Sequence, residues 1–441
     1  MHHNDEGCEF VLKLHEHPQR RNIASEMHTH PYPHLPTPGR ISHLAYLNHH
    51  CNLAHELWLF GQLAHHYSLE PPSPSASYFS LDLGHCRVLW MRYSEFSSFS
   101  VSAPQVDGAE GFLRPALAEL PSEWLAQLPS NVLVAIHALV LPYAQLPAGL
   151  PDLAHLYFAG QELAGAAIGE GAGHLYSDFK ADENGFVHYV LADRFMGRRQ
   201  AGRMLQRLFD IESYRTLAML APPLAGQLAP ELAVADRELA ELTRSISHAR
   251  EQDEPILLDR LTQLSARIES ALSQTDYRFS ASHAYYEIVL RRLDELREHR
   301  IQGLQPLKQF ITRRLTPAME HCNVVARRQR ELAERVSRAT LLLRTRVDVT
   351  LEQQNQRILS SMSEHAQLQL RLQQTVEGLS VAAISYYIIS LLAYGLKGLK
   401  AAGWHLNVEL LLGLAIPVVA LGILAGLRVM RQHLAPKTQH G

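Results

Sequence analysis

The sequence has few cysteines and no large excess of charge of one sign, and these absences exclude several classes of protein. Four cysteines are scattered over 441 residues, and no two of them form a C-x-x-C pair. This excludes a small domain held together by disulfides and favours reduced thiols in a cytoplasmic compartment. The formal net charge is -3, so bulk electrostatics predict no attraction to nucleic acid or acidic lipid.

Charged residues are almost absent from two stretches near the C-terminus. Residues 378–396 contain none, and residues 408–427 contain only Glu409, close to one edge. Each stretch has about 20 residues, the length that a helix needs to cross roughly 30 Å of hydrocarbon. We interpret residues 378–427 as a two-helix transmembrane hairpin with a short link at 397–407.

Glycine and proline are both missing from residues 318–377. As one helix, this stretch would be about 90 Å long at a rise of 1.5 Å per residue. Its apolar residues recur at steps of three and four with departures from strict heptads, which predicts a coiled-coil-like stalk packed on earlier helices or on other copies of the chain. Because such a helix cannot cover its own apolar stripe, we expect a homo-oligomer. The stripe is formed by Leu332, Val336, Leu343, Val347, Leu351, Ile358 and Met362.

The first 195 residues have a different pattern. Residues 1–40 are rich in histidine and proline, and their prolines prevent a continuous helix, so they are expected to form an extended N-terminal strap. Residues 41–195 predict a mixed α/β domain, because strand-like and helix-like segments alternate. The expected strands are 78–83, 86–101, 131–141, 162–170, 174–180 and 186–193, and residues 41–47 are either a strand or the entry to a helix at 49–68.

Beyond residue 196 we expect only helices. A helical domain at 196–316 should contain helices at 197–221, at 231–248 and from 253 toward 300, because prolines interrupt the pattern between them. The stalk then occupies 317–377, starting after Pro317, and a basic tail at 428–441 follows the hairpin. The predicted fold is thus an α/β or α+β head, a long-helix stalk and a C-terminal membrane hairpin.

The sequence also predicts an orientation in the membrane. The N-terminus lacks the apolar core of a secretory signal. Lysines and arginines flank the two apolar stretches on their outer sides and also lie in the link, and the larger number on the outer sides favours both chain termini in the cytoplasm. The residues counted are Arg371, Arg428, Arg431 and Lys437 on the outer sides, against Lys397 and Lys400 in the link. The expected location is a bacterial inner membrane crossed twice.

Residues with the chemistry of a catalytic or metal site are sparse. His28, His30 and His34 have a spacing that could converge on a zinc-like ion, whereas surface or packed histidines are the alternative. Gly169, Gly171 and Gly173 precede an expected strand rather than a helix, so they indicate a turn between strands and not a phosphate loop. No G-x-S-x-G elbow, Walker A loop or catalytic Cys–His spacing occurs. We therefore expect no enzyme activity, no cofactor and no nucleic-acid partner.

Several stretches together resemble a known family. They are HPQRRNIASEMHTHPYPHLPTPGRISHLA (17–45), QAGRMLQRLFDIESYRTLAML (200–220), YRFSASHAYYEIV (277–289), LLRTRVDVTLEQQNQRILSSM (342–362) and LQLRLQQTVEGLSVAAISYY (368–387). Through them the chain resembles domain-of-unknown-function family 3422, uncharacterised bacterial membrane-anchored proteins. The resemblance implies no particular activity. In the first stretch, the residues to test for function are His17, Glu26, His28, Arg40 and His43, with attachment of the strap to the head as the alternative role.

A looser likeness is architectural. A cytoplasmic head, a long helix, two C-terminal spans and a basic tail are similar to the layout of CorA-type metal-ion transporters. Those proteins carry Tyr-Gly-Met-Asn at the end of the first span, whereas this chain has Tyr394, Gly395, Leu396 and Lys397 there as its possible selectivity segment. A ring of lysines would repel a divalent cation. The leading hypothesis is therefore a head that senses or binds a partner and is coupled to the membrane hairpin, and the alternative is a CorA-like ion channel or transporter.

Overall fold

The computed structural model describes residues 17, 20, 35–48, 51–104, 112–401 and 407–434. The chain divides into two compact units according to its internal contacts. The first unit comprises Met1–Ser247 and Asp259–Ala339, and the second comprises His248–Leu258 and Thr340–Gly441.

A nine-stranded mixed sheet forms the centre of the first unit. The strand order is β2-β3-β4-β1-β5-β8-β7-β6-β9. Strands β5 and β8 pair in parallel, and all other neighbours pair antiparallel. The strands are β1 (Gly39–Leu47), β2 (Tyr78–Asp82), β3 (Arg87–Arg92), β4 (Phe96–Pro104), β5 (Val132–Pro142), β6 (Ala164–Ile168), β7 (Gly173–Ser177), β8 (Val187–Asp193) and β9 (His299–Arg300).

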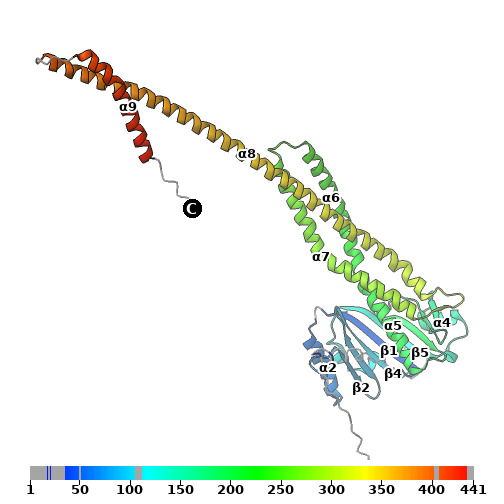
Figure 1. Cartoon of the computed structure of the whole chain (residues 1–441). Helices are drawn as coiled ribbons and strands as arrows, with labels where there is room; N and C mark the ends of the chain where they lie inside the picture. Colours follow the sequence, from blue (N-terminus) through cyan, green and yellow to red (C-terminus); the bar gives the residue numbers. More distant parts are fainter. Residues whose placement is uncertain are drawn as a thin grey trace, which may run out of the picture. The chain divides into compact units, whose positions relative to one another are not determined.

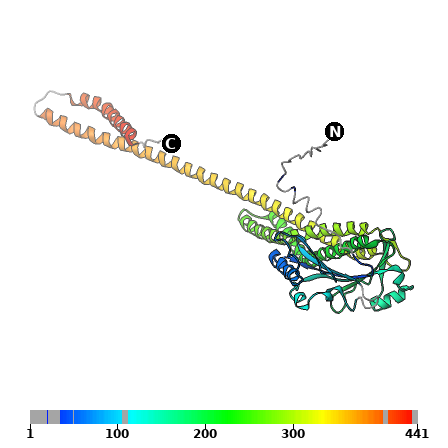
Figure 2. The ribbon, with the colours of Figure 1, turned by 90° about the horizontal axis from the view of Figure 1, so that it is seen from below.

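Helices cover both faces of this sheet (Figures 1 and 2). One face carries α2 (Leu53–His66), α3 (Ser122–Leu125) and α4 (Leu150–Phe158), together with the short 3-10 helices η2 (Ala116–Glu119) and η3 (Tyr143–Gln145). The opposite face carries α5 (Gly197–Ala218). Because both faces are covered, the central strand β5 is buried along most of its length, which explains its nearly continuous apolar sequence.

The apolar core on the α2 side consists of two separate clusters. The first packs Phe60 of α2 against Trp90, Phe99 and Trp124, with ring centroids 5.4–6.3 Å apart. The second joins α4 to the ends of β5 and β8. Fully burying one such aromatic or aliphatic side chain contributes about 1.5–3 kcal/mol, so these clusters fix the helices on the sheet. Between the two clusters lies a band of polar side chains.

Long helices follow strand β8 in sequence. They are α6 (Ala221–His248), α7 (Glu254–Glu295) and α8 (Leu307–Ala401), and α8 alone has 95 residues. An α/β head with a mixed sheet followed by long helices confirms the first part of the predicted fold class.

Several predicted boundaries of individual elements are wrong. The first turn of α6 accommodates Pro222 and Pro223, where missing N–H groups cost nothing, so the helix starts earlier than expected. Helix α8 starts at Leu307 and continues through Pro317. One strand, β9, occurs after residue 196 because His299 and Arg300 pair with the edge strand β6. The 86–101 run is two strands, β3 and β4, and not one.

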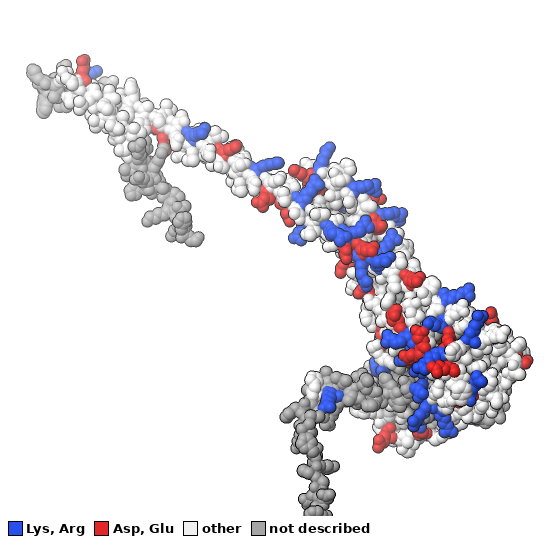
Figure 3. All heavy atoms as spheres, turned by 45° about the vertical axis from the view of Figure 1, so that its right-hand side comes forward, with Lys and Arg blue, Asp and Glu red and all other residues white. Residues whose placement is uncertain are grey.

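The second unit contains the rest of α8 from Thr340, the helix α9 (Val408–Leu434) and the start of α7. Arg346 of α8 forms an ion pair of 2.6 Å with Glu254, whose side chain is buried. Beyond this contact, almost every described side chain of α8 and α9 is exposed or half-buried. In Figure 3, lysines, arginines and acidic residues are dense over the helices of the first unit and become sparse over the last part of α8.

Candidate functional site

Strand β1 carries the two predicted motif residues whose positions in the sheet are described. Side chains alternate across a strand, so Arg40 and His43 lie on opposite faces of the sheet: Arg40 contacts the segment 114–119 and His43 contacts α5. The structure describes His17 without its sequence neighbours, and its side chain is exposed. Glu26, His28, His30 and His34 lie outside the described residues. The predicted metal site at His28, His30 and His34 therefore stays a prediction, and among the residues that the structure describes there is no possible metal-binding group of three.

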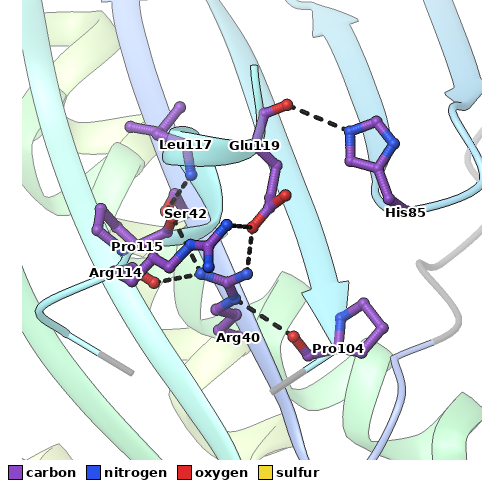
Figure 4. Close-up of polar contacts among 8 residues, drawn as sticks. All are labelled: Arg40, Ser42, His85, Pro104, Arg114, Pro115, Leu117 and Glu119. Carbon is purple, nitrogen blue, oxygen red and sulfur yellow. Dashed lines mark hydrogen bonds and ion pairs between the residues drawn. The ribbon is translucent and has the colours of Figure 1, made fainter. Parts of the chain in front are cut away.

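Arg40 holds the segment before α3 against the sheet (Figure 4). Its side chain is 5% exposed, so each N–H group needs a partner. The guanidinium donates hydrogen bonds to three backbone carbonyls and pairs with the carboxylate of Glu119. The carbonyls belong to Arg114, Pro115 (3.4 Å) and Pro104 (3.3 Å). Because all of these bonds are to the protein itself, Arg40 joins η2 to β1 and β4.

Ser42 continues this polar band across the sheet. Its hydroxyl accepts a hydrogen bond from the backbone N–H of Leu117 (3.3 Å) and shares one of 2.9 Å with Nδ1 of His137 on β5. His137 is in register with His188 of β8. Nε2 of His188 lies 3.3 Å from Asp182, in the turn between β7 and β8. The row therefore runs from Arg40 to Asp182 over three strands.

Aromatic rings and burial suppress the charge of these histidines. His137 stacks on Phe186 at 3.9 Å and His188 stacks on Phe112 at 4.3 Å. Burial, reinforced by His188, lowers the pKa of His137 to about 4. Burial also lowers the pKa of His188, although Asp182 opposes that shift. Ser42 is completely buried, and the hydrogen bonds of the row connect the segment 114–119 and strands β1 and β5 to one another.

His43 lies in an apolar setting on the opposite face. Its ring stacks on Phe209 of α5 at 4.3 Å and its Nδ1 lies 2.8 Å from the hydroxyl of Ser100. Burial lowers the pKa of His43 to about 3. Its Nε2 has no hydrogen-bond partner in the described part of the chain. His43 is therefore neutral at physiological pH and packs as part of the contact between the sheet and α5.

Stretches that carry the family resemblance meet at the turn between β3 and β4. Glu95 in this turn is 5% exposed. It accepts a hydrogen bond from the hydroxyl of Tyr277 and one of 2.9 Å from Arg278, both on α7. Burial raises the pKa of Glu95, but these donors outweigh burial and leave it lowered. Beside it, Tyr214 of α5 packs edge-on against Phe96 and tilted against Tyr285 of α7. This Glu95 junction ties the sheet to two long helices.

Two cavities in the described part of the chain combine aromatic and basic side chains. One, of about 220 Å³, lies beside the stacked rings of Phe179 and Phe310 and is flanked by Arg215 and Arg314. Another, of about 300 Å³, contains His174 and Tyr176, which share a hydrogen bond of 3.0 Å. Burial and Arg194 lower the pKa of His174. Both cavities offer binding space with polar edges, and the lining residues include no carboxylate and no cysteine.

The predicted selectivity segment lies inside a helix. Tyr394, Gly395, Leu396 and Lys397 belong to α8, which continues to Ala401. Tyr394 is 74% exposed. Among the described residues, three helical stretches are long and apolar enough to cross a membrane: Gly197–His248, Leu307–Gly398 and Glu409–Gly426. In the last two, none of the most apolar window is buried.

Sequence reasoning missed Ser42, Glu119, His137 and His188. These residues are far apart in sequence: strand pairing places Ser42, His137 and His188 in one row, and the contact with Arg40 brings Glu119 to it. A usable signal was present in the polar residues of otherwise apolar strands, such as His137 within VLVAIHALVL. Such a residue on a buried strand needs a partner, but the sequence does not say which strand supplies it.

The fold and these sites define an α/β head whose segments are joined by buried polar contacts. Long helices follow it, and the C-terminal part of α8 and most of α9 expose apolar side chains. The chain matches the model of a family described as protein of unknown function (DUF3422) over residues 15–434, and it belongs to that family. No curated protein and no solved structure matches it.

Proposed function

We propose that this protein is a homo-oligomeric membrane anchor with a non-enzymatic head in the cytoplasm. In this proposal the head binds a partner or ligand and is coupled through α8 to a hairpin in the membrane. The proposal rests on one observation above all, which is the uncovered apolar surface at the end of α8 and along α9.

That surface is too apolar to remain in water. Residues 378–398 of α8 contain no acidic residue, and large side chains there are widely exposed, with Leu379 at 74% and Leu391 at 72%. In α9, Leu414 and Leu421 are exposed by 69% and 66%. Transfer of each such side chain from water to an apolar phase is worth about 1.5–3 kcal/mol. Two adjacent helices of spanning length therefore favour insertion in a bilayer.

The third apolar stretch, at Gly197–His248, has a different explanation. A third of its most apolar window is buried. Leu217, Leu228 and Leu232 are buried residues of its helices. Apolar residues that are buried inside the protein do not need to be buried in lipid. We therefore assign α5 and α6 to the head, and only the end of α8 and α9 to the membrane.

The proposed location is the inner membrane of a bacterium, with both ends of the chain in the cytoplasm. Positive residues outside the hairpin are Arg371, Arg428, Arg431 and Lys437, against Lys397 and Lys400 in the link, and cytoplasmic segments are enriched in lysine and arginine. A reporter enzyme that is active only outside the cytoplasm tests this topology. It should be active when inserted at residue 404 and inactive when fused after residue 441, and the reverse pattern would contradict the orientation.

The proposed role of the head follows from the buried polar contacts that join its sheet to helices and surface segments. The Glu95 junction connects the sheet to α5 and α7, while Arg40 and the histidine row hold surface segments on the opposite side. The cavity beside Phe310 and the cavity beside His174 have no carboxylate, cysteine, serine or threonine in their lining. These features support binding or sensing rather than catalysis. A small ligand could bind in the cavity beside Phe310 or in the cavity that contains His174.

Ion conduction is a second candidate, because the predicted spans continue directly from a long helix that starts at an α/β head. Flux measurements in liposomes separate the two functions. An anchored sensor gives no cation or anion flux above that of empty liposomes. Reproducible flux that changes when Lys397 is replaced by asparagine would favour the channel.

A further inference from the structure

One face of α8 has a strict heptad pattern over residues 351–379. Its seam positions alternate at steps of four and three, as in a coiled coil. The d positions are Leu351, Ile358, His365, Leu372 and Leu379, and the a positions are Asn355, Met362, Gln369 and Val376. The seam spans four heptads, which is long enough for a coiled coil to be a specific prediction.

No part of the chain covers this seam among the residues described. All nine seam residues are exposed, with Ile358 at 58%, Met362 at 63% and Leu372 at 69%. The earlier stripe residues Leu332, Val336 and Leu343 are buried. The seam therefore begins where the internal packing of α8 ends, and its apolar residues need a partner from outside the chain.

The charges beside the seam favour a second copy of the same chain. In a homodimer, a charged residue at the flanking e and g positions would lie near residues of its own sequence. Those positions carry Glu352 as their only charge, at the first e position. The other charges of the heptads lie away from the seam, with Arg357, Glu364 and Arg371 at c positions and Glu377 at a b position. Two identical helices can thus approach without repulsion between like charges.

The polar seam residues favour a parallel over an antiparallel arrangement of the two α8 helices. In a parallel, in-register pair, a faces a and d faces d, so Asn355, Gln369 and His365 each meet their own counterpart. In an antiparallel pair, a faces d. One polar d position cannot serve two polar a positions, so at least one amide would face an apolar side chain without a hydrogen-bond partner.

We propose that residues 351–379 form a parallel, in-register coiled coil with a second copy of this chain. The proposal rests on the proposed membrane anchoring, since hairpins inserted in one membrane with one orientation point their stalks the same way. It identifies the partner surface and fixes which residues meet.

Disulfide trapping at single introduced cysteines tests this arrangement in the full-length chain purified in detergent. The variants M362C and V376C place a thiol at two a positions, and E364C places one at a c position as the matched control. A Cys8→Ser background leaves the three cysteines that are buried in the structure. Disulfides form only when Cα atoms come within about 7 Å.

The parallel coiled coil predicts covalent dimers for both M362C and V376C, at least about tenfold more than for E364C, because only facing positions meet disulfide geometry. An antiparallel pair has one crossing point, so it would trap one of the two positions at most and would overturn the proposed direction. Equal trapping at all three positions, or none at either a position, would overturn the seam itself.

Membrane fractionation of the same variants keeps this result separate from the proposed function. Anchored chains that fail to trap would overturn the coiled coil and leave the anchor intact. Trapping in chains that remain soluble without detergent would keep the parallel pairing and overturn the anchor.

Discussion

At the scale of single residues, the head is held by polar groups that have been taken out of water and given partners. Arg40 shows the principle, because its guanidinium is buried and bonded only to the protein. A buried charge contributes little net stability when paired, but removing its partner is costly. The residues that the sequence singled out as possible functional groups, Arg40 and His43, therefore have structural contacts of the kind that would tie segments together.

Substitution of Arg40 tests this role. In Arg40→Leu, Glu119 loses its buried partner and three backbone carbonyls lose a donor, so we expect a loss of about 3–5 kcal/mol in unfolding free energy. The matched control is Arg114→Leu, since Arg114 is 62% exposed and lies 3.5 Å from the same carboxylate. Exposed pairs contribute under about 1 kcal/mol. Denaturant unfolding of the detergent-solubilised chain measures both, and equal effects would contradict the assignment.

The buried histidines predict a dependence of stability on pH. The pKa of His43 is lowered from 6.5 to about 3 in the folded head, so below pH 6.5 the unfolded chain binds a proton that the folded chain does not. Stability is therefore fully present above pH 6.5 and falls as the pH drops toward 3. The slope is at most about 1.4 kcal/mol per pH unit for one histidine.

His43→Gln should retain a hydrogen bond to Ser100 and lose this titration. Between pH 7.5 and pH 5 the melting temperature of the parent should fall, and that of the variant should fall less, because His137 still titrates with its pKa lowered to about 4. Unchanged pH dependence in the variant would show that His43 is not the group responsible.

At the scale of elements, hydropathy and alternation predicted the class of most segments, and long-range pairing decided the rest. The α/β head and the long helices were predictable because alternating strands and uninterrupted helical runs are local patterns. Strand β9 was not, because His299 and Arg300 form a strand only by pairing with β6. The histidine row depends on pairing of β1 with β5 and of β5 with β8, so its residues could not be grouped from the sequence.

The predicted start of α8 was wrong because long-range packing outweighs the local effect of a proline. Pro317 removes one backbone hydrogen bond from α8, but Ile311, Leu315, Met319 and Cys322 are buried around it. The packing of these apolar residues offsets the loss and keeps the helix continuous.

Within the stalk, the polar seam residues set alignment at a cost in stability. A single asparagine at an a position weakens a coiled coil while fixing its register. Asn355→Leu should therefore strengthen association of the full chain, lowering the concentration at which oligomers dissociate in detergent. Gln356→Leu, one residue further and off the seam, is the matched control. Sedimentation measures both, and weaker association of Asn355→Leu would contradict the heptad assignment.

At the scale of the whole molecule, one chain combines a head with closed apolar core clusters and a C-terminal pair of helices whose most apolar windows are uncovered. The core clusters of the head are closed by its own helices, whereas the most apolar windows at the ends of α8 and α9 have no buried residue. This contrast is the physical basis for the proposed membrane anchor, and oligomerisation through the stalk is consistent with it.

Partition of the chain between membrane and water tests that claim most directly. We expect the full-length protein, expressed in bacteria, to sediment with membranes, to resist extraction by alkaline carbonate and to dissolve only in detergent, whereas a chain ending at residue 377 should remain in the supernatant. Recovery of the full-length protein as a monodisperse species in buffer without detergent would contradict the anchor and the function proposed from it.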